Sequence, residues 1–247
     1  MEQNEKTELT HWEDAWSARP RMSFPTGIDI GTRNVFQLLK KHLHPGVRYV
    51  EVGCAPGKIL SWVARELDAP VCGIDYSPTG VEHTKWLCEG LDVEADVRCE
   101  DALSTSFEKA SFDLVFSCGL IEHFDDPAPM VAAHVELLAP GGTALIAIPN
   151  YSGLYLKLQR WCDPDNLAIH NLDIMNENAM YELAPKSPDL TIRSFSFGKF
   201  SPWLISLPSR FGRAGVLISW GLNFIARLQP FDIKAVCPLV VLEIKRL

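Results

Sequence analysis

Tyr49-Val50-Glu51-Val52-Gly53-Cys54-Ala55-Pro56-Gly57 is the stretch that decides how the rest of the sequence is interpreted. Its first half is an apolar run of strand length, and its second half holds the small residues and proline of a tight turn. A helical pattern begins at about Lys58, so the segment predicts a strand, a turn and a helix in succession. Glycine lets a ligand approach the backbone of such a turn, and the first helical N–H groups can bind polar ligand atoms. Taken alone, so short a motif also fits a turn that binds no ligand.

Strand-like and helix-like segments alternate along the first 150 residues. The runs that predict strands are 49–54, 71–75, 96–100, 112–118 and 143–148, and the segments with helical periodicity are 59–67, 80–89 and 129–138. This alternation predicts βαβ units, and therefore a parallel sheet with helices on both faces. Ligands of such sheets bind at the carboxyl ends of the strands.

The pattern changes after Pro149. Residues 149–188 are rich in aromatic and turn-forming residues, which predicts helices and loops over one end of the sheet. Strands are predicted again at 190–197 and 237–244, with an apolar, arginine-containing segment at 200–230 between them. That segment fits an interfacial helix pair that approaches a membrane. It also fits a helix between the last two strands with a dimer contact, and base rates favour this second interpretation.

Acidic residues accompany three successive predicted strands. Glu51 lies in the first, Asp75 ends the second and Asp101 follows the third. A carboxylate at the position of Asp75 can accept hydrogen bonds from both hydroxyls of a ribose. One at Asp101 can accept from the exocyclic amine of adenine. The glycine spacing does not match the dinucleotide fingerprint, and Glu51 would repel a pyrophosphate, so a nicotinamide cofactor is disfavoured.

In order and spacing these motifs resemble those of the class I S-adenosylmethionine-dependent methyltransferases. The resemblance covers residues 45–150 and rests on Glu51-x-Gly-x-Ala-x-Gly57, Asp75, Asp101, Phe112-Asp113-Leu114-Val115-Phe116 and Leu138-Ala139-Pro140-Gly141-Gly142. Glu122-His123-Phe124 after the fourth strand resembles the small-molecule type that includes ubiquinone-pathway O-methyltransferases. The resemblance implies a Rossmann-like three-layer α/β sandwich with a mostly parallel seven-stranded sheet whose last strand is antiparallel. Ala55 departs from the glycine that is frequent in the family.

The resemblance also implies roles for individual residues around S-adenosylmethionine. Glu51 would lie beneath the methionine end, Asp75 would hold the ribose, and Asp101 with Ala102 would frame the adenine. Cys118 and Gly119 would flank the methionine and the substrate entrance, and the product would be S-adenosylhomocysteine. The predicted cofactor-binding residues are Glu51, Gly53, Cys54, Ala55, Gly57, Asp75, Tyr76, Asp101, Ala102, Cys118 and Gly119.

The sequence places a candidate general base after the fourth strand. Methyl transfer from a sulfonium needs a base only where the acceptor loses a proton, and His123 has a residue type suited to that task near neutral pH. A purely structural role for His123 has equal weight. His170 is a second candidate base or substrate contact, and Tyr151 and Tyr155 are candidates for an aromatic wall around the acceptor. No metal site is predicted, because some ubiquinone-pathway relatives place a carboxylate where this chain has Gly119.

Composition restricts the class of partner. The chain has 247 residues and a net charge of −8 with no dense cluster of Lys and Arg, which disfavours nucleic acid. Seven scattered cysteines without paired spacing, a polar N-terminus and no apolar stretch of spanning length predict a cytoplasmic protein. His11, Trp12 and Trp16 form a hypothetical lid over the cofactor.

The sequence predicts one methyltransferase domain over residues 1–247. Within it, residues 1–45 form the N-terminal helices and lid, 46–150 the cofactor-binding half, and 151–189 with 198–236 the acceptor-side cover. The predicted function is methyl transfer to a hydroxyl of a small molecule or glycan. The alternatives are an N-methyltransferase on a small amine and a non-catalytic S-adenosylmethionine-binding module. A lipid-linked substrate contact through 200–230 and a homodimer are further predictions.

Overall fold

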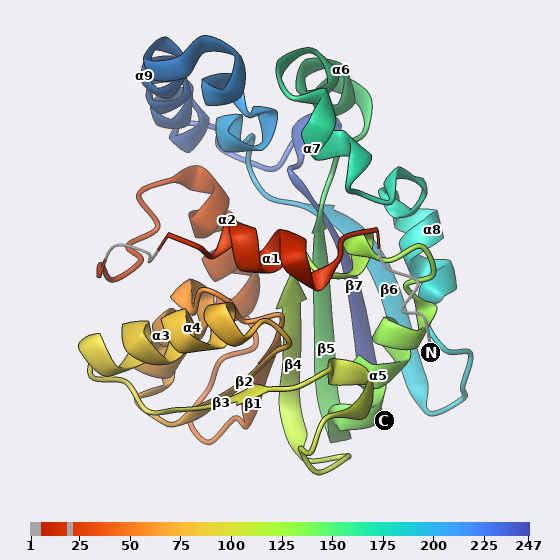
Figure 1. Cartoon of the computed structure of the whole chain (residues 1–247). Helices are drawn as coiled ribbons and strands as arrows, with labels where there is room; N and C mark the ends of the chain where they lie inside the picture. The colour runs from red at the N-terminus through yellow and green to blue at the C-terminus, as the bar shows by residue number, and fades with distance from the viewer. Residues whose placement is uncertain (1–5, 19–21) are drawn as a thin grey trace.

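A seven-stranded sheet in the order β3-β2-β1-β4-β5-β7-β6 forms the centre of the molecule (Figure 1). The computed structural model describes residues 6–18 and 22–247. Neighbouring strands from β3 to β5 pair in parallel, and β7 is antiparallel to both β5 and β6. The strands are β1 (Tyr49–Val52), β2 (Val71–Asp75), β3 (Ala95–Cys99), β4 (Phe112–Cys118), β5 (Leu138–Pro149), β6 (Leu190–Phe197) and β7 (Leu239–Arg246). The predicted fold class, with an antiparallel last strand, is therefore confirmed.

Helices cover both faces of this sheet, as its fully buried central strands require. On one face, α2 (Ile30–Lys40), α3 (Lys58–Leu67) and α4 (Pro78–Gly90) pack on a core that includes Tyr49 and Phe116. On the other face, α5 (Ala128–Leu137) and α8 (Glu177–Leu183) pack on a core that includes Val50 and Val115. Neighbouring residues of one strand thus enter opposite cores, which produces the three-layer arrangement.

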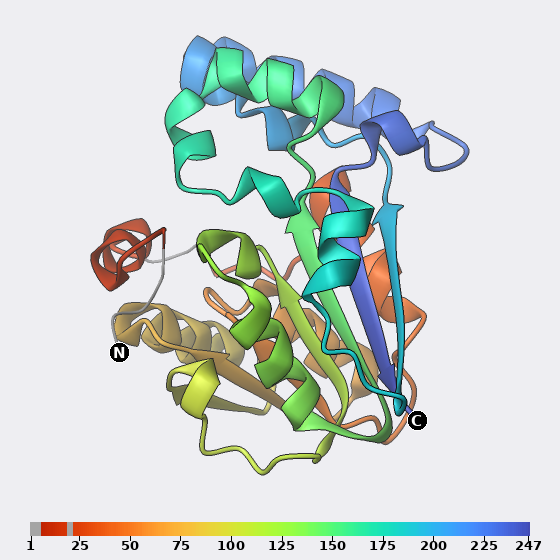
Figure 2. The ribbon, with the colours of Figure 1, turned by 90° about the vertical axis from the view of Figure 1, so that its right-hand side faces the viewer.

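A helical cap lies beyond the carboxyl ends of the parallel strands (Figures 1 and 2). It consists of α6 (Gly153–Cys162), α7 (Pro164–Ala168) and α9 (Leu207–Arg227), with the short 3-10 turns η3 (Leu172–Ile174) and η4 (Pro202–Ile205) nearby. The helix α9 connects β6 to β7, as predicted for the segment between the last two strands, and it bends at Gly212, whose φ is 51°. Among the described residues, no helix is both long enough and apolar enough to cross a bilayer.

The helix α1 (Leu9–Ala15) lies in front of the carboxyl ends of the parallel strands (Figure 1). It is held at both ends. The Lys6 N–H donates to the carbonyl of His123 at 2.7 Å, and Lys6 Nζ lies 3.0 Å from the Asp125 carboxylate. At the other end, both carboxylate oxygens of Glu13 accept hydrogen bonds from Ser77 and Thr79 at the start of α4.

Candidate active site

A cavity opens at the carboxyl ends of β1, β2 and β4, where α1 covers them. The space between its walls is about 880 Å³, a volume that includes open solvent at the mouth. Nine predicted site residues line it: Gly53, Ala55, Asp75, Tyr76, Asp101, Ala102, Cys118, Gly119 and His123. Trp12 and Trp16 of the hypothetical lid also line it. The lining residues that were not predicted are Thr7, Val52, Ile74, Glu100, Leu120, Phe124 and Met130.

The turn after β1 divides the predicted motif into lining and supporting residues. Gly53 lines the cavity with a φ of +73°, and its N–H donates to the Ile74 carbonyl at 2.8 Å, which holds the turn against β2. Gly57 is the N-cap of α3 with a φ of +86°, and a Cβ on it would lie 2.9–3.0 Å from Thr84 of α4. Cys54 is buried beneath Gly73. Gly57 and Cys54 are thus not lining residues, because they pack the turn against its neighbours.

Asp75 is oriented by the backbone around it. Its Oδ2 accepts from the Ala55 N–H at 3.0 Å, and its Oδ1 accepts from the Ser77 N–H at 3.0 Å. Burial raises the pKa of this carboxyl, while the two backbone donors act in the opposite direction. Because each carboxylate oxygen can accept more than one hydrogen bond, Asp75 retains acceptor capacity toward the cavity.

Glu51 lies behind the cavity wall rather than in it. It is 3% exposed, and the hydroxyl of Tyr49 donates to its Oε2 at 3.3 Å. Burial raises the pKa of Glu51 well above its ordinary value, and the nearby Asp75 adds to this effect. Glu51 thus does not line the cavity, because a strand side chain at this position enters the core between the sheet and α3, and its place beneath the methionine end of the cofactor stays a prediction.

The loop after β3 forms the opposite wall. Asp101 caps the 3-10 turn η1 (Ala102–Ser104) by accepting from the Leu103 N–H at 2.9 Å. Hydrogen bonds from the Ser106 hydroxyl, from the Ser106 N–H at 2.8 Å and from the Thr105 hydroxyl at 2.7 Å lower the pKa of the Glu100 carboxyl. These bonds hold the loop in a defined shape beside Ala102 and Tyr76, which also line the cavity.

Aromatic rings of α1 form the remaining side of the cavity. Trp12 stacks on Trp16 with ring centroids 6.2 Å apart, and it contacts His123 edge-on at 4.9 Å. The ring of His11 contacts Trp12 at 5.2 Å and does not line the cavity. Sequence reasoning identified the two tryptophans but missed Glu13, whose role depends on a contact with α4 that no local pattern indicates.

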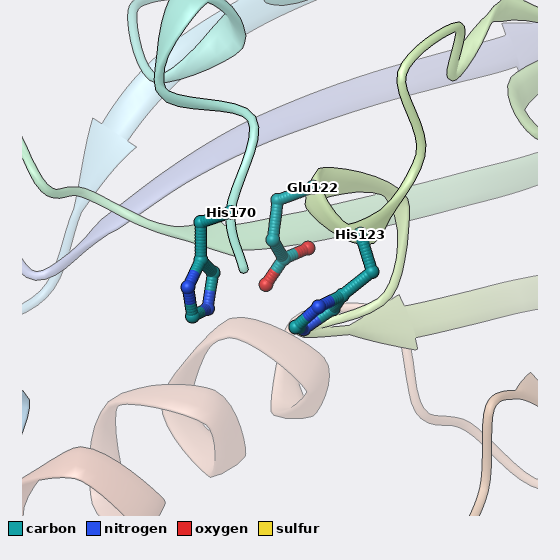
Figure 3. Close-up of side chains that lie close together, drawn as sticks. All are labelled: Glu122, His123 and His170. Carbon is teal, nitrogen blue, oxygen red and sulfur yellow. The ribbon is translucent and has the colours of Figure 1, made fainter. Parts of the chain in front are cut away.

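Three ionisable side chains meet at the edge of the cavity (Figure 3). Glu122 and His123 come from the 3-10 turn η2 (Ile121–His123) after β4, and His170 comes from the loop after α7. One ligand atom from each lies within 4.8 Å of the others, and the Glu122 carboxylate lies between the two imidazoles. Glu122 is 1% exposed and His123 6% exposed, and neither Glu122 Oε2 nor His123 Nδ1 has a hydrogen-bond partner.

Burial controls the charge of this cluster. It raises the pKa of Glu122 to about 8, opposed only by a backbone hydrogen bond. Burial lowers the pKa of His123 to about 3. The neighbouring His170 acts in the same direction, whereas a hydrogen bond to the Ile169 carbonyl opposes the shift. Burial also lowers the pKa of His170. All three groups are therefore uncharged at neutral pH.

The structure places Tyr151 and Tyr155, the two predicted aromatic contacts of the acceptor, in different surroundings. The hydroxyl of Tyr151 accepts from the Asn166 side-chain amide at 2.9 Å, and its ring meets His170 edge-on at 5.2 Å, so Tyr151 adjoins the cluster. Tyr155 is 1% exposed, and its hydroxyl donates to the Val236 carbonyl and accepts from the Ser201 N–H. The prediction of Tyr155 as a substrate contact is wrong, because this side chain joins α6 to the cap's interior.

Comparison with known proteins identifies the class. Residues 50–146 match the family described as "Methyltransferase domain". The chain is 34% identical over 107 residues to a ubiquinone biosynthesis O-methyltransferase of Xanthomonas campestris pv. campestris (strain B100), covering 43% of this chain and 44% of that protein. It is 34% identical over 129 residues to a ribosomal protein L11 methyltransferase of Ralstonia pickettii (strain 12J), covering 52% and 41%. The chain thus spans less than half of the length of these curated relatives.

A solved structure extends the likeness to the fold. The plantazolicin methyltransferase BpumL in complex with SAH superposes with a TM-score of 0.55 at 16% identity, over 89% of this chain and 82% of that one. Fold, cavity and matched segment together define a Rossmann-like methyltransferase domain. The methyltransferase family match over residues 50–146, the curated relatives and the fold together support a class I S-adenosylmethionine-dependent methyltransferase with S-adenosylmethionine as cofactor.

Proposed function

We propose that this protein transfers the methyl group of S-adenosylmethionine to a hydroxyl group of a small molecule or glycan. The observation that carries the proposal is the buried, uncharged cluster of Glu122, His123 and His170 at the edge of the cavity. A hydroxyl can enter such a site as a neutral group and donate to a free lone pair. An ammonium group would find no charged partner there, and burying an unpaired charge is costly. The cluster therefore favours O-methylation over N-methylation.

The expected chemistry is an in-line displacement. The acceptor oxygen forms a bond to the methyl carbon while the carbon–sulfur bond breaks, and its electron pair stays on sulfur to give S-adenosylhomocysteine. Holding oxygen, carbon and sulfur collinear supplies much of the acceleration, because the sulfonium is already activated. The weakly basic imidazole of His123 accepts a hydrogen bond from the hydroxyl and takes its proton as the oxygen loses electron density.

The exposed side of α9 supports a proposal about where the acceptor is presented. Leu217, Phe224 and Ile225 are 74%, 67% and 63% exposed, and Arg210, Arg213 and Arg227 of the same helix are exposed beside them. Residues 191–231 contain no Asp or Glu, although the chain has a net charge of −8. Apolar side chains flanked by arginines complement an anionic lipid surface. We therefore propose that the cap approaches such a surface to reach a lipid-linked acceptor.

Vesicle binding tests that surface. The protein should co-sediment with phosphatidylglycerol vesicles and less with phosphatidylcholine vesicles, and Leu217→Glu with Phe224→Glu should abolish the difference. Lys109→Glu, at an exposed lysine far from α9, is the matched control. If the pair of substitutions instead dissociates a homodimer in light scattering, the surface is a subunit interface and the lipid proposal fails.

Turnover tests the proposed reaction. S-Adenosylhomocysteine release should occur with members of a panel of phenols and sugars, in equal amounts with methylated product, and not with amines. His123→Ala should lower turnover by at least about 100-fold while the calorimetric Kd for S-adenosylmethionine changes less than twofold. His44→Ala, at an exposed histidine, should leave both unchanged. Turnover confined to amines would assign N-methylation, and cofactor binding without turnover on any class would assign a non-catalytic module.

Seven unpaired cysteines support a reducing, cytoplasmic compartment.

A further inference from the structure

We propose that Glu122, His123 and His170 bind a divalent transition-metal ion such as Zn²⁺ at the acceptor side of the cavity. Sequence analysis predicted no metal, because the position of Gly119 offers no ligand. The structure supplies a third ligand from elsewhere, since the loop after α7 brings His170 to within 4.8 Å of the donors on η2. The role of the ion in catalysis rests on the proposed methylation of a hydroxyl, whereas the site itself does not. With the ion bound, Glu122 is deprotonated and His123 is a ligand, so the ion takes the place of the His123 lone pair in activating the acceptor hydroxyl, and the proton leaves to solvent.

Two buried atoms without hydrogen-bond partners support a ligand bound between these side chains. Glu122 Oε2 and His123 Nδ1 are buried without hydrogen bonds, and leaving such an atom unpaired costs roughly 1–3 kcal/mol. The described salt bridges include none to Glu122, so a bound metal ion is the cation with which its deprotonated form would pair. Metal–ligand bonds of about 2.1 Å place donors roughly 3–4 Å apart, so side-chain shifts of about 1 Å complete the coordination.

The surrounding hydrogen bonds orient these side chains in the way that hydrogen bonds orient the ligands of metal sites. His170 Nδ1 lies 2.5 Å from the carbonyl of Asn166, so Nδ1 carries the proton and Nε2 presents its lone pair. The Asn171 N–H donates to the Glu122 carbonyl at 2.6 Å, and its side-chain amide donates to the carbonyls of Phe124 and Asp125. These bonds fasten the loop of His170 to the turn of Glu122, so the three ligands are held together before any ion binds.

The donor set selects the kind of ion. Two imidazoles and one carboxylate suit Zn²⁺, Fe²⁺ or Co²⁺, whereas Mg²⁺ and Ca²⁺ prefer all-oxygen coordination. Three protein ligands would leave at least one position open for water or substrate, and His123, one of the three, lines the cavity. Gly119 lies beside this point with a φ of +74°, a backbone conformation that favours glycine. Bound at this point, the ion acts as a Lewis acid that makes an acceptor hydroxyl more acidic.

Direct metal binding tests the site without reference to turnover. The full chain, stripped with EDTA, is titrated with Co²⁺ and then Zn²⁺, without S-adenosylmethionine or acceptor. Calorimetry should give one ion per chain, Co²⁺ should produce visible ligand-field absorption, and Zn²⁺ should displace it while excess Mg²⁺ does not. Bound Zn²⁺ should also raise the Tm.

Matched variants locate the ion. Glu122→Gln, which keeps the shape of the side chain, and His170→Ala should each weaken Co²⁺ binding by at least about 100-fold, more than outer-shell losses typically do. His44→Ala and Cys99→Ser, at exposed side chains, should bind as the parent does. Equal binding by all four variants, or no binding by the parent, overturns the proposal. Binding at this site without methylation of any acceptor would leave the metal site standing and refute only the proposed function.

Discussion

His134 should make the fold sensitive to acid, and the size of the effect follows from its surroundings. It is fully buried in α5, with Nδ1 2.7 Å from the Met130 carbonyl and Nε2 2.9 Å from the Ser117 hydroxyl of β4. In the neutral ring Nδ1–H donates to the Met130 carbonyl and Nε2 accepts from the Ser117 hydroxyl, whereas the protonated ring would place an unpaired charge in the core. Burial lowers the pKa of His134 to about 4, opposed by the Met130 carbonyl.

This shift converts into a free energy of unfolding. The unfolded chain binds a proton at the ordinary histidine pKa of about 6.5, whereas the folded chain does so at about 4. Between these values the unfolded state holds more protons, so stability is fully present above pH 6.5 and falls as the pH drops toward 4. The loss attributable to His134 is about 3 kcal/mol, at 1.36 kcal/mol for each pKa unit.

Urea unfolding of the parent and of His134→Gln from pH 7.5 to 4 measures this contribution. The difference in unfolding free energy between them should be constant above pH 6.5 and should shift in favour of the variant by about 3 kcal/mol near pH 4. Ser117→Ala, which removes the partner of Nε2 but keeps the titrating ring, should cost about 1 kcal/mol at neutral pH and retain the acid slope. Parallel pH profiles for the parent and His134→Gln would refute the reasoning.

Two further predictions concern the cofactor. Asp75→Asn can offer only one acceptor oxygen to the two backbone donors, so the calorimetric Kd for S-adenosylmethionine should rise by roughly 10–100-fold, whereas Asp165→Asn, at an exposed site, should not change it. Glu13→Gln weakens the attachment of α1 to Ser77 and Thr79, so stopped-flow fluorescence should report faster cofactor release than in the parent or in Glu8→Gln. An unchanged release rate would mean that α1 does not retain the ligand.

The regular half of the fold could be predicted because its signals are local. The predicted strands 71–75, 112–118 and 190–197 coincide with β2, β4 and β6, since each is an apolar or alternating run with a polar or turn-forming boundary. The start of β5 was missed. Leu138 pairs with Phe112 before an irregularity in the ladder, and the Pro140-Gly141-Gly142 sequence indicates a turn rather than a strand.

The acceptor side could not be predicted with the same success, because its contacts are distant in sequence. His170 reaches Glu122 through the hydrogen bonds of Asn171, and no periodicity identifies that partner. The sequence predicted Tyr151 and Tyr155 as one aromatic wall, but it could not distinguish Tyr151, which precedes α6 and lies beside the cluster, from Tyr155, which lies in α6 and in the cap's interior. The cofactor side depends on strand ends that share one edge of the sheet, which is why residues such as Asp75 and Gly53 could be found.

The position of β7 between β5 and β6 affects the order in which the chain folds during synthesis. The strands β1 to β5 and their connecting helices pair through successive crossovers, each of which can close once its second strand has been made. In the sheet, β6 pairs only with β7, which is made after α9. The half that holds the cofactor cavity can therefore fold first during synthesis, whereas the cap can join the sheet only after β7 has been made.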